Sequence, residues 1–210
     1  SQAGKLKHLF RLSEGIFEKW GYLPVMPSLY QIPLDDRPEE SLPQGVLRTS
    51  LAKEMLRVIQ THLGDMILPV RYWYGGPVSV VIPQKNRVTE THELGIEFVG
   101  SELMTAEAEV ISIALELLKA AQIKELRLTV GHQAFLEGLL ESNVKGARQK
   151  VGILQGNEEI FSQAQQFSSH QKCERAIEDL KWLARGLREF GYKDPIYYDL
   201  EPFMDAHAYP

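Results

Sequence analysis

Residues 70–100 read VRYWYGGPVSVVIPQKNRVTETHELGIEFVG, and this stretch decides the fold class. Residues 70–74 and 77–82 are rich in β-branched and aromatic side chains, which favour extended chain. Residues 94–100 alternate apolar with polar or small side chains, as a half-buried strand does. With a turn expected at Gly75–Pro77, the stretch predicts antiparallel strands of one sheet.

Helical patterns occur on both sides of these strands. Apolar residues recur at three- and four-residue steps, which predicts helices over residues 5–20, 48–62 and 101–121. Ser50 is available to cap the second of these helices. Residues 22–28 are apolar and flanked by prolines, so they predict an extended segment. The sheet is therefore expected to be flanked by helices.

The second half of the sequence passes from strand to helix and back. Residues 126–130 predict a strand, residues 133–190 are mostly helical in pattern, and residues 196–200 predict a final strand. We therefore expect an α+β fold with an antiparallel sheet, flanking helices and a helical insertion. The predicted segments are a core over 1–132, a helical insertion over 133–192, and a return to the core sheet over 193–210, with the core incomplete at its C-terminal end.

Charge and composition argue against nucleic acid and membranes as binding partners. The net charge of −5 argues against a surface devoted to nucleic acid, and the basic residues over 172–188 alternate with acids as on a solvated helix face. No stretch reaches the ~18 apolar residues that cross a bilayer. Without a signal-type segment from Ser1 onward, we expect a cytoplasmic protein that binds neither nucleic acid nor membrane. Cys173 lies on an apolar helical stripe and is expected to be a core thiol.

Candidate metal and phosphate sites are weak in this sequence. His92 beside Glu93 and His207 near Asp205 supply histidine and carboxylate ligands, but a zinc site needs a third and fourth ligand that the sequence does not bring together. The turn expected at Gly75–Pro77 is not followed by a helix N-terminus, so it is not a phosphate cradle. We expect no metal and no cofactor.

Four segments of the sequence occur in the order of motifs found in one enzyme family. They are residues 17–27 (FEKWGYLPVMP), residues 47–59 (LRTSLAKEMLRVI), residues 72–100, and residues 126–135 (LRLTVGHQAF) taken with residues 196–209. Together they resemble the catalytic core of class II aminoacyl-tRNA synthetases, and more narrowly the histidyl branch. The first segment is similar to the motif through which that family forms dimers.

The resemblance fails at residues that the enzymes need. It implies an arginine that touches the ATP phosphate and the amino-acid carboxylate, but Ser79 occupies that position, and Met204 occupies the position of a second arginine. An acidic residue and a threonine of the family are replaced by Ser50 and Ala52. The third motif, which carries a further ATP-binding arginine, has no counterpart. Loss of such an arginine costs ~10³-fold or more in rate, so we expect no aminoacylation and no catalytic residues.

The regulatory subunits that pair with short ATP phosphoribosyltransferase catalytic subunits keep this scaffold without synthetase chemistry, and the sequence is similar to them. The resemblance implies a non-catalytic protein of histidine biosynthesis that serves assembly, activation and histidine feedback. The implied partners are the catalytic subunit, a second copy bound through residues 17–27, and free histidine. Two alternatives are a divergent histidyl-tRNA synthetase and another synthetase-like paralogue.

The resemblance also implies a histidine-binding set composed of Glu93, Glu97 and Tyr209. Strand alternation points both carboxylates to one face, and a carboxylate can hold an imidazole or ammonium group. Two alternatives stay open at this point. The carboxylates could be solvated or paired with Arg87 and Lys85, and the tyrosine could be an ordinary half-buried strand residue.

Overall fold

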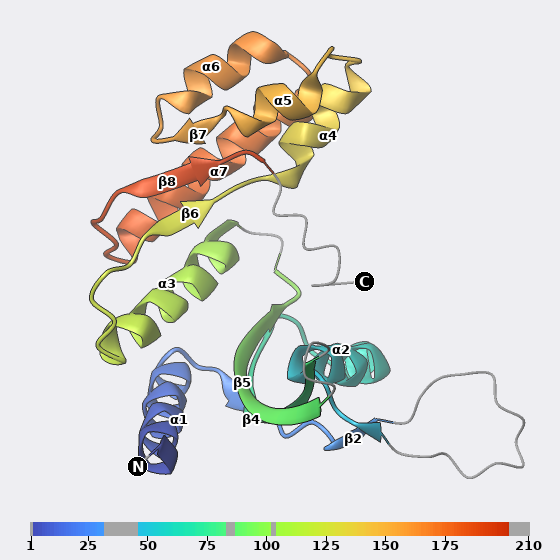
Figure 1. Cartoon of the computed structure of the whole chain (residues 1–210), viewed down its shortest axis with the longest axis vertical. Coiled ribbons are helices and arrows are strands. Elements are labelled where there is room, and N and C mark those ends of the chain that lie inside the picture. The colour runs from blue at the N-terminus through green and yellow to red at the C-terminus, as the bar shows by residue number, and fades with distance from the viewer. Residues whose placement is uncertain (1, 32–45, 83–86, 102–103, 202–210) are drawn as a thin grey trace, which may run out of the picture. The chain divides into compact units, whose positions relative to one another are not determined.

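The protein is described by a computed structural model that covers residues 2–31, 46–82, 87–101 and 104–201 (Figure 1). The chain divides into two compact units, Ser1–Glu102 and Leu103–Pro210. Each unit combines helices with a sheet, which confirms the predicted α+β class. Among the described residues, no helix has both the length and the apolar character that a membrane span requires.

A long antiparallel ribbon forms the sheet of the first unit. Strand β4 (Val70–Ile82) pairs with β5 (Arg87–Val99) along its whole length. The short strand β1 (Leu23–Pro24) pairs in parallel with β4, so the strand order is β1-β4-β5. The ribbon is longer than the sequence predicted, because β5 begins well before residue 94.

The predicted turn at Gly75–Pro77 is wrong, because β4 continues through it without a break. Both glycines lie where neighbouring side chains pack closely against the strand. A Cβ at Gly75 would lie 2.6 Å from a methyl group of Leu94, and a Cβ at Gly76 would lie 2.7 Å from the Arg48 guanidinium. A glycine pair within a strand thus marks the approach of neighbouring side chains to the backbone.

Two helices of the first unit contact opposite faces of the ribbon (Figure 1). Helix α1 (Gln2–Lys19) places Phe17 against Trp73, with ring centroids 5.7 Å apart. Helix α2 (Leu51–His62) packs on the other face, because its buried side chains share a cluster with Tyr74, the next residue along the strand. The ribbon therefore separates two small apolar layers.

The predicted cap of α2 is confirmed. Ser50 is extended, and its hydroxyl accepts a hydrogen bond from the Lys53 amide. The remaining elements of this unit are short: β2 (Tyr30–Gln31), β3 (Val46–Leu47), which pairs with it, and the 3-10 helix η1 (Leu63–Asp65).

The second unit contains most of the helices and a three-stranded sheet. In this sheet β8 (Ile196–Asp199) lies between the parallel strand β6 (Leu128–Val130) and the antiparallel strand β7 (Gln155–Gly156). The strand β7 was not predicted from its polar, glutamine-rich surroundings. The helices are α3 (Met104–Ala120), α4 (Gln133–Glu141), α5 (Ala147–Gly152), α6 (Ile160–Phe167) and α7 (Gln171–Glu189).

Helix α7 is the centre of this second core. Cys173 is buried on its inner face, where its thiol donates to the Phe135 carbonyl at 3.4 Å and burial raises its pKa. The predicted core thiol is therefore confirmed. Helix α4 crosses at the same point, because a Cβ on Gly138 would lie 2.7 Å from the Cys173 sulfur. Helix α3 makes a similarly close approach at Ala108 opposite Gly186.

The division into compact units falls after Glu102, whereas the predicted core extends to residue 132. Helix α3 packs on α7, and β6 pairs with β8, so residues 104–130 share a core with the predicted insertion. Compactness therefore groups these residues differently from the predicted segments. Which residues are an insertion in the evolutionary sense stays a prediction.

We predict that Gly138→Ala destabilises the second unit. The added methyl group would meet the Cys173 sulfur and amide at 2.7 and 3.1 Å, so two helices would have to separate. The expected loss is about 1–3 kcal/mol of unfolding free energy, measured by urea denaturation. Gly15→Ala is the control, since it has open space in α1 and should stabilise by about 0.5–1 kcal/mol. Equal losses in the two variants would contradict the packing argument.

Candidate functional site

The face of the ribbon under α2 carries the predicted carboxylates. Glu93 accepts a hydrogen bond from the Leu51 amide, at 2.6 Å between nitrogen and Oε2. The amides of a first helical turn lack partners within the helix and carry partial positive charge. Glu93 therefore joins β5 to the start of α2, and its other carboxylate oxygen has no role in this contact.

Glu97 accepts a hydrogen bond from the Tyr74 hydroxyl at 3.0 Å. Tyr74 is 4% exposed, and its ring end lies over Gly95, where a Cβ would come within 2.4 Å of the hydroxyl oxygen. Burial raises the pKa of Glu97, and the hydrogen bond from Tyr74 offsets part of that rise. The carboxyl group is therefore poised to take up a proton more readily than an exposed glutamate.

Both carboxylates lie on one face, as predicted. Glu93 is opposite Gly76, Gly95 is opposite Tyr74, and Glu97 is two positions further along β5. Four residues of strand separate Glu93 from Glu97 by ~13 Å, too far for one small group to touch both backbone positions. The Tyr74 hydroxyl fills the interval over Gly95, so the face presents carboxylate, hydroxyl and carboxylate in a row.

The sequence left open whether Glu93 and Glu97 pair with Arg87 and Lys85, and the structure answers this in part. The contacts described above connect Glu93 and Glu97 to Leu51 and Tyr74, not to Arg87, while Lys85 lies outside the described residues. Tyr209 also lies outside the described residues, as do Met204, Asp205 and His207. The structure brings Glu93 and Glu97 to one face of the ribbon, and the binding of histidine by Glu93, Glu97 and Tyr209 stays a prediction.

Arg48 is the central residue of this region that sequence reasoning missed. It is 7% exposed, and its guanidinium donates to three main-chain carbonyls: Pro77 at 2.8 Å, Pro27 at 2.8 Å and Ser28 at 3.2 Å. Its own carbonyl accepts from the Ser79 amide at 2.9 Å. Arg48 therefore binds the chain after β1 to the middle of β4.

Ser79 occupies the position that the family resemblance assigns to an ATP-binding arginine, and it is an ordinary strand residue here. Ser79 is half-buried in β4 opposite Glu90. Its neighbour Arg48 already uses its Nε and Nη1 donors on main-chain carbonyls, and its Nη2 lies against Gly76. Ser50 serves as the helix cap, and Ala52 packs beside the α2 core. These four residues have local structural roles.

The described residues contain no group of three or more side chains suited to a metal ion. His92, one of the predicted candidates, instead meets the Phe10 ring edge-on, with centroids 5.8 Å apart. The chemistry available on the α2 face is therefore that of carboxylates and a tyrosine hydroxyl, which suits recognition of a cationic or hydrogen-bond-donating ligand.

We predict that Glu97→Gln removes a pH-dependent loss of stability. Above the ordinary pKa of 4.5, an unfolded chain releases the Glu97 proton while the native state retains it up to its raised pKa. Wild-type stability therefore falls through this window as pH rises, whereas the glutamine variant keeps an acceptor for Tyr74 without titrating. Urea denaturation at several pH values from 4 to 7 should show that the unfolding free energy of the variant, relative to that of the wild type, increases as the pH rises. A constant difference would contradict the burial of this carboxyl.

The sequence is similar to known proteins of one family. Residues 34–151 match the family model described as histidyl-tRNA synthetase. A curated relative from Halothermothrix orenii, named ATP phosphoribosyltransferase regulatory subunit, is 23% identical over 95% of this chain and 59% of its own length. The chain spans roughly half the length of the curated relatives it matches, for example 46% of the Geobacter metallireducens protein.

Solved structures share the fold. The ATP phosphoribosyltransferase regulatory subunit/histidyl-tRNA synthetase from Bacillus halodurans has a TM-score of 0.78 at 19% identity, over 95% of this chain and 65% of that one. A chain of the ATP phosphoribosyl transferase complex from Thermotoga maritima has a TM-score of 0.59 at 15% identity, over 94% and 80%. The fold is thus synthetase-like, and because the family model matches more than half of its residues, this chain belongs to the histidyl-tRNA synthetase family.

Proposed function

We propose that this protein is a non-catalytic regulatory subunit of short-form ATP phosphoribosyltransferase, acting in cytoplasmic histidine biosynthesis. In this role it would support assembly, activation and histidine feedback of the catalytic subunit. The names of the curated relatives support the proposal, as does the likeness to a chain of the Thermotoga maritima complex.

The observation that carries the proposal is Ser79 in the position of the ATP-binding arginine. A guanidinium grips phosphate through paired, charged hydrogen bonds that a serine hydroxyl cannot supply. Arg48, close by in the fold, donates through Nε and Nη1 to three carbonyls and joins β4 to residues 27–28. A protein that keeps the scaffold without this cation is suited to binding and assembly rather than to amino-acid activation.

The second candidate, a divergent histidyl-tRNA synthetase, is favoured by the family model itself. It would need cations from elsewhere to replace the group missing at Ser79. A synthetase-like paralogue with another partner is the third candidate. The three differ in activity and in the protein they bind, so one pair of assays separates them.

Histidine is the effector that the proposal assigns to the α2 face. Its ammonium or imidazole group can donate to the Glu97 carboxylate, and the adjacent Tyr74 supplies a hydroxyl. A ligand about as long as an amino acid would engage Glu97 and Tyr74 together, with Glu93 at the far end of the row.

We expect the purified chain to activate a short catalytic phosphoribosyltransferase subunit, to co-elute with it, and to show no histidine-dependent ATP–pyrophosphate exchange. The physical reason is the missing guanidinium at Ser79. Exchange above background, or failure to bind the catalytic subunit, would overturn the proposal in favour of the second or third candidate respectively.

Histidine feedback provides the control within the same assay. Glu97→Gln should weaken inhibition by histidine while leaving activation intact, because a neutral amide replaces a charged acceptor. Glu90→Gln is the matched control, since Glu90 is exposed and an odd number of residues away on the same strand, so it faces the opposite side. If both variants changed histidine inhibition equally, the proposal that histidine binds on this face would be wrong.

A self-dimer is the remaining part of the proposal. The outer strand β1 and the residues after it expose apolar side chains: Leu23 is 63% and Met26 is 93% exposed. Exposed apolar groups beside an outer strand are typical of an interface between subunits.

We predict that Met26→Asp shifts the chain from dimer to monomer in light scattering, since a carboxylate at the interface would have to be desolvated. Ile153→Asp is the control, because Ile153 is 67% exposed in the second unit. The dimer would be assigned to a different surface if Met26→Asp left the mass unchanged.

A further inference from the structure

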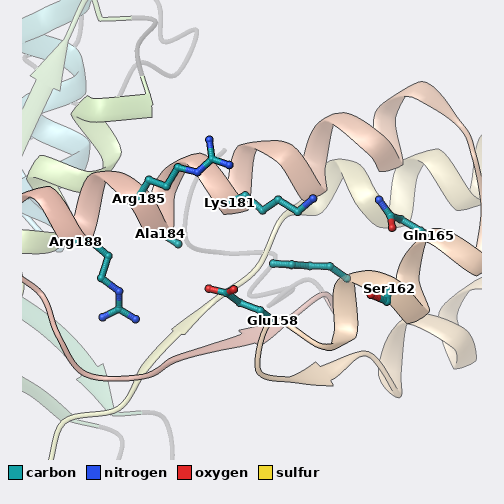
Figure 2. Close-up of a pocket in the computed structure, with 8 residues that line it drawn as sticks. Glu158, Ser162, Gln165, Lys181, Ala184, Arg185 and Arg188 are labelled. Atoms are coloured by element: carbon teal, nitrogen blue, oxygen red, sulfur yellow. The ribbon is translucent and has the colours of Figure 1, made fainter.

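A pocket lies within the second unit between α6 and α7, with a volume of about 370 Å³ (Figure 2). This volume is in the range of small-molecule sites. The pocket is distinct from the α2 face, because its lining residues all belong to Leu103–Pro210. The proposed regulatory function gives it no role.

Three cations of α7 line this pocket: Lys181, Arg185 and Arg188. Figure 2 shows all three leaving the same helix, with the Arg188 guanidinium on the side of Glu158 and the Arg185 guanidinium on the other side of α7. Arg188 donates to the carbonyls of Tyr192 and Asp194 at 2.9 and 2.8 Å. Carbonyl partners fix the guanidinium in place without neutralising its charge.

Lys181 is held less firmly than Arg188. Its ammonium pairs with Glu178 at 2.7 Å, one turn earlier on the same helix. Such a partly exposed pair contributes little to stability, so the ammonium can turn to a ligand at small cost. Seven residues of helix separate Lys181 from Arg188 by ~10.5 Å along the axis. A ligand that engages both cations therefore carries negative charge at two points.

The facing segment adds polar groups and an apolar floor. Ser162 and Gln165 of α6 line the pocket with a hydroxyl and an amide, while Phe161 lines it with its ring. Glu158 is the carboxylate of the lining, and Lys181 and Arg188 outnumber it two to one, since the Arg185 guanidinium lies on the other side of α7 over the Trp182 ring. This surplus favours an anion, and Glu158 itself opposes one.

A buried hydroxyl lies behind the floor. The Tyr198 ring packs against Phe161 with centroids 4.7 Å apart, and Tyr198 is fully buried. Its hydroxyl has no hydrogen-bond partner among the described residues. Burial, with a smaller contribution from the Glu158 carboxylate and an opposing one from Arg188, raises the pKa of Tyr198 to about 12. Two pocket residues therefore act electrostatically on this unpaired group.

We propose that the pocket between α6 and α7 binds a small molecule with two separated anionic groups, of the diphosphate or dicarboxylate type. Lys181 and Arg188 hold the two ends, and Ser162 and Gln165 donate from the facing helix. The site is independent of the proposed regulatory function.

Calorimetric titration of the full chain with inorganic pyrophosphate, succinate and orthophosphate at matched ionic strength tests this proposal. Pyrophosphate or succinate should bind saturably at one site and more tightly than orthophosphate, and the better of the two identifies the anionic group. Lys181→Gln and Ser162→Asp should each weaken binding about tenfold or more. Glu158→Gln should tighten it, by up to about fivefold, because a repulsive carboxylate is removed.

The control is Arg175→Gln on the same helix. Arg175 is outside the pocket lining, with its side chain 81% exposed, so its loss should leave affinity unchanged. Three results would overturn the proposal: no saturable binding of either two-point anion, orthophosphate binding as tightly as both, or an equal loss in Arg175→Gln. Circular dichroism of each variant confirms that the fold is retained.

Discussion

The first unit depends on one buried guanidinium. Arg48 is fixed by carbonyls that lie 20, 21 and 29 residues away in sequence, so a single side chain positions β1, α2 and the middle of β4. Removing it would leave the buried Pro27 carbonyl without this donor, at a cost of about 1–3 kcal/mol, and would also break two partly buried bonds. The absence of a side chain at Gly76 leaves room for the Arg48 guanidinium. Helix α2 begins three residues after Arg48, and its first amide, that of Leu51, donates to Glu93. The candidate effector face therefore depends on an arginine whose described hydrogen bonds are all to main-chain carbonyls.

Local sequence patterns predicted much of the fold. The three-and-four spacing located α1, α2 and α3, and Ser50 correctly marked the start of a helix. The glycine pair in β4 was misread, since a turn and a close side-chain approach leave the same residues in the sequence. Strand β7 was missed because its two residues are extended only through pairing with β8. Such pairing depends on the fold and leaves no local signal.

The candidate site was predicted only in part, and for a physical reason. Alternation placed Glu93 and Glu97 on one face, but it could not supply their partners, because Tyr74 reaches Glu97 through a register set by the whole ribbon. Arg48 carried no signal of its own, since carbonyl acceptors are present in every residue. The charged pocket in the second unit was read as an ordinary solvated helix face, and only the packing of α6 beside α7 encloses it.

The continuity of β4 has a mechanical consequence. A strand of 13 residues has a contour length of about 40 Å, and β4 pairs with β5 along all of it while the ribbon curves (Figure 1). A ribbon interrupted by a turn would have a hinge at its midpoint, whereas this one resists bending in the plane of its ladder. The ladder therefore runs unbroken from the residues that pair with β1 to the part of β4 that is bonded to Arg48.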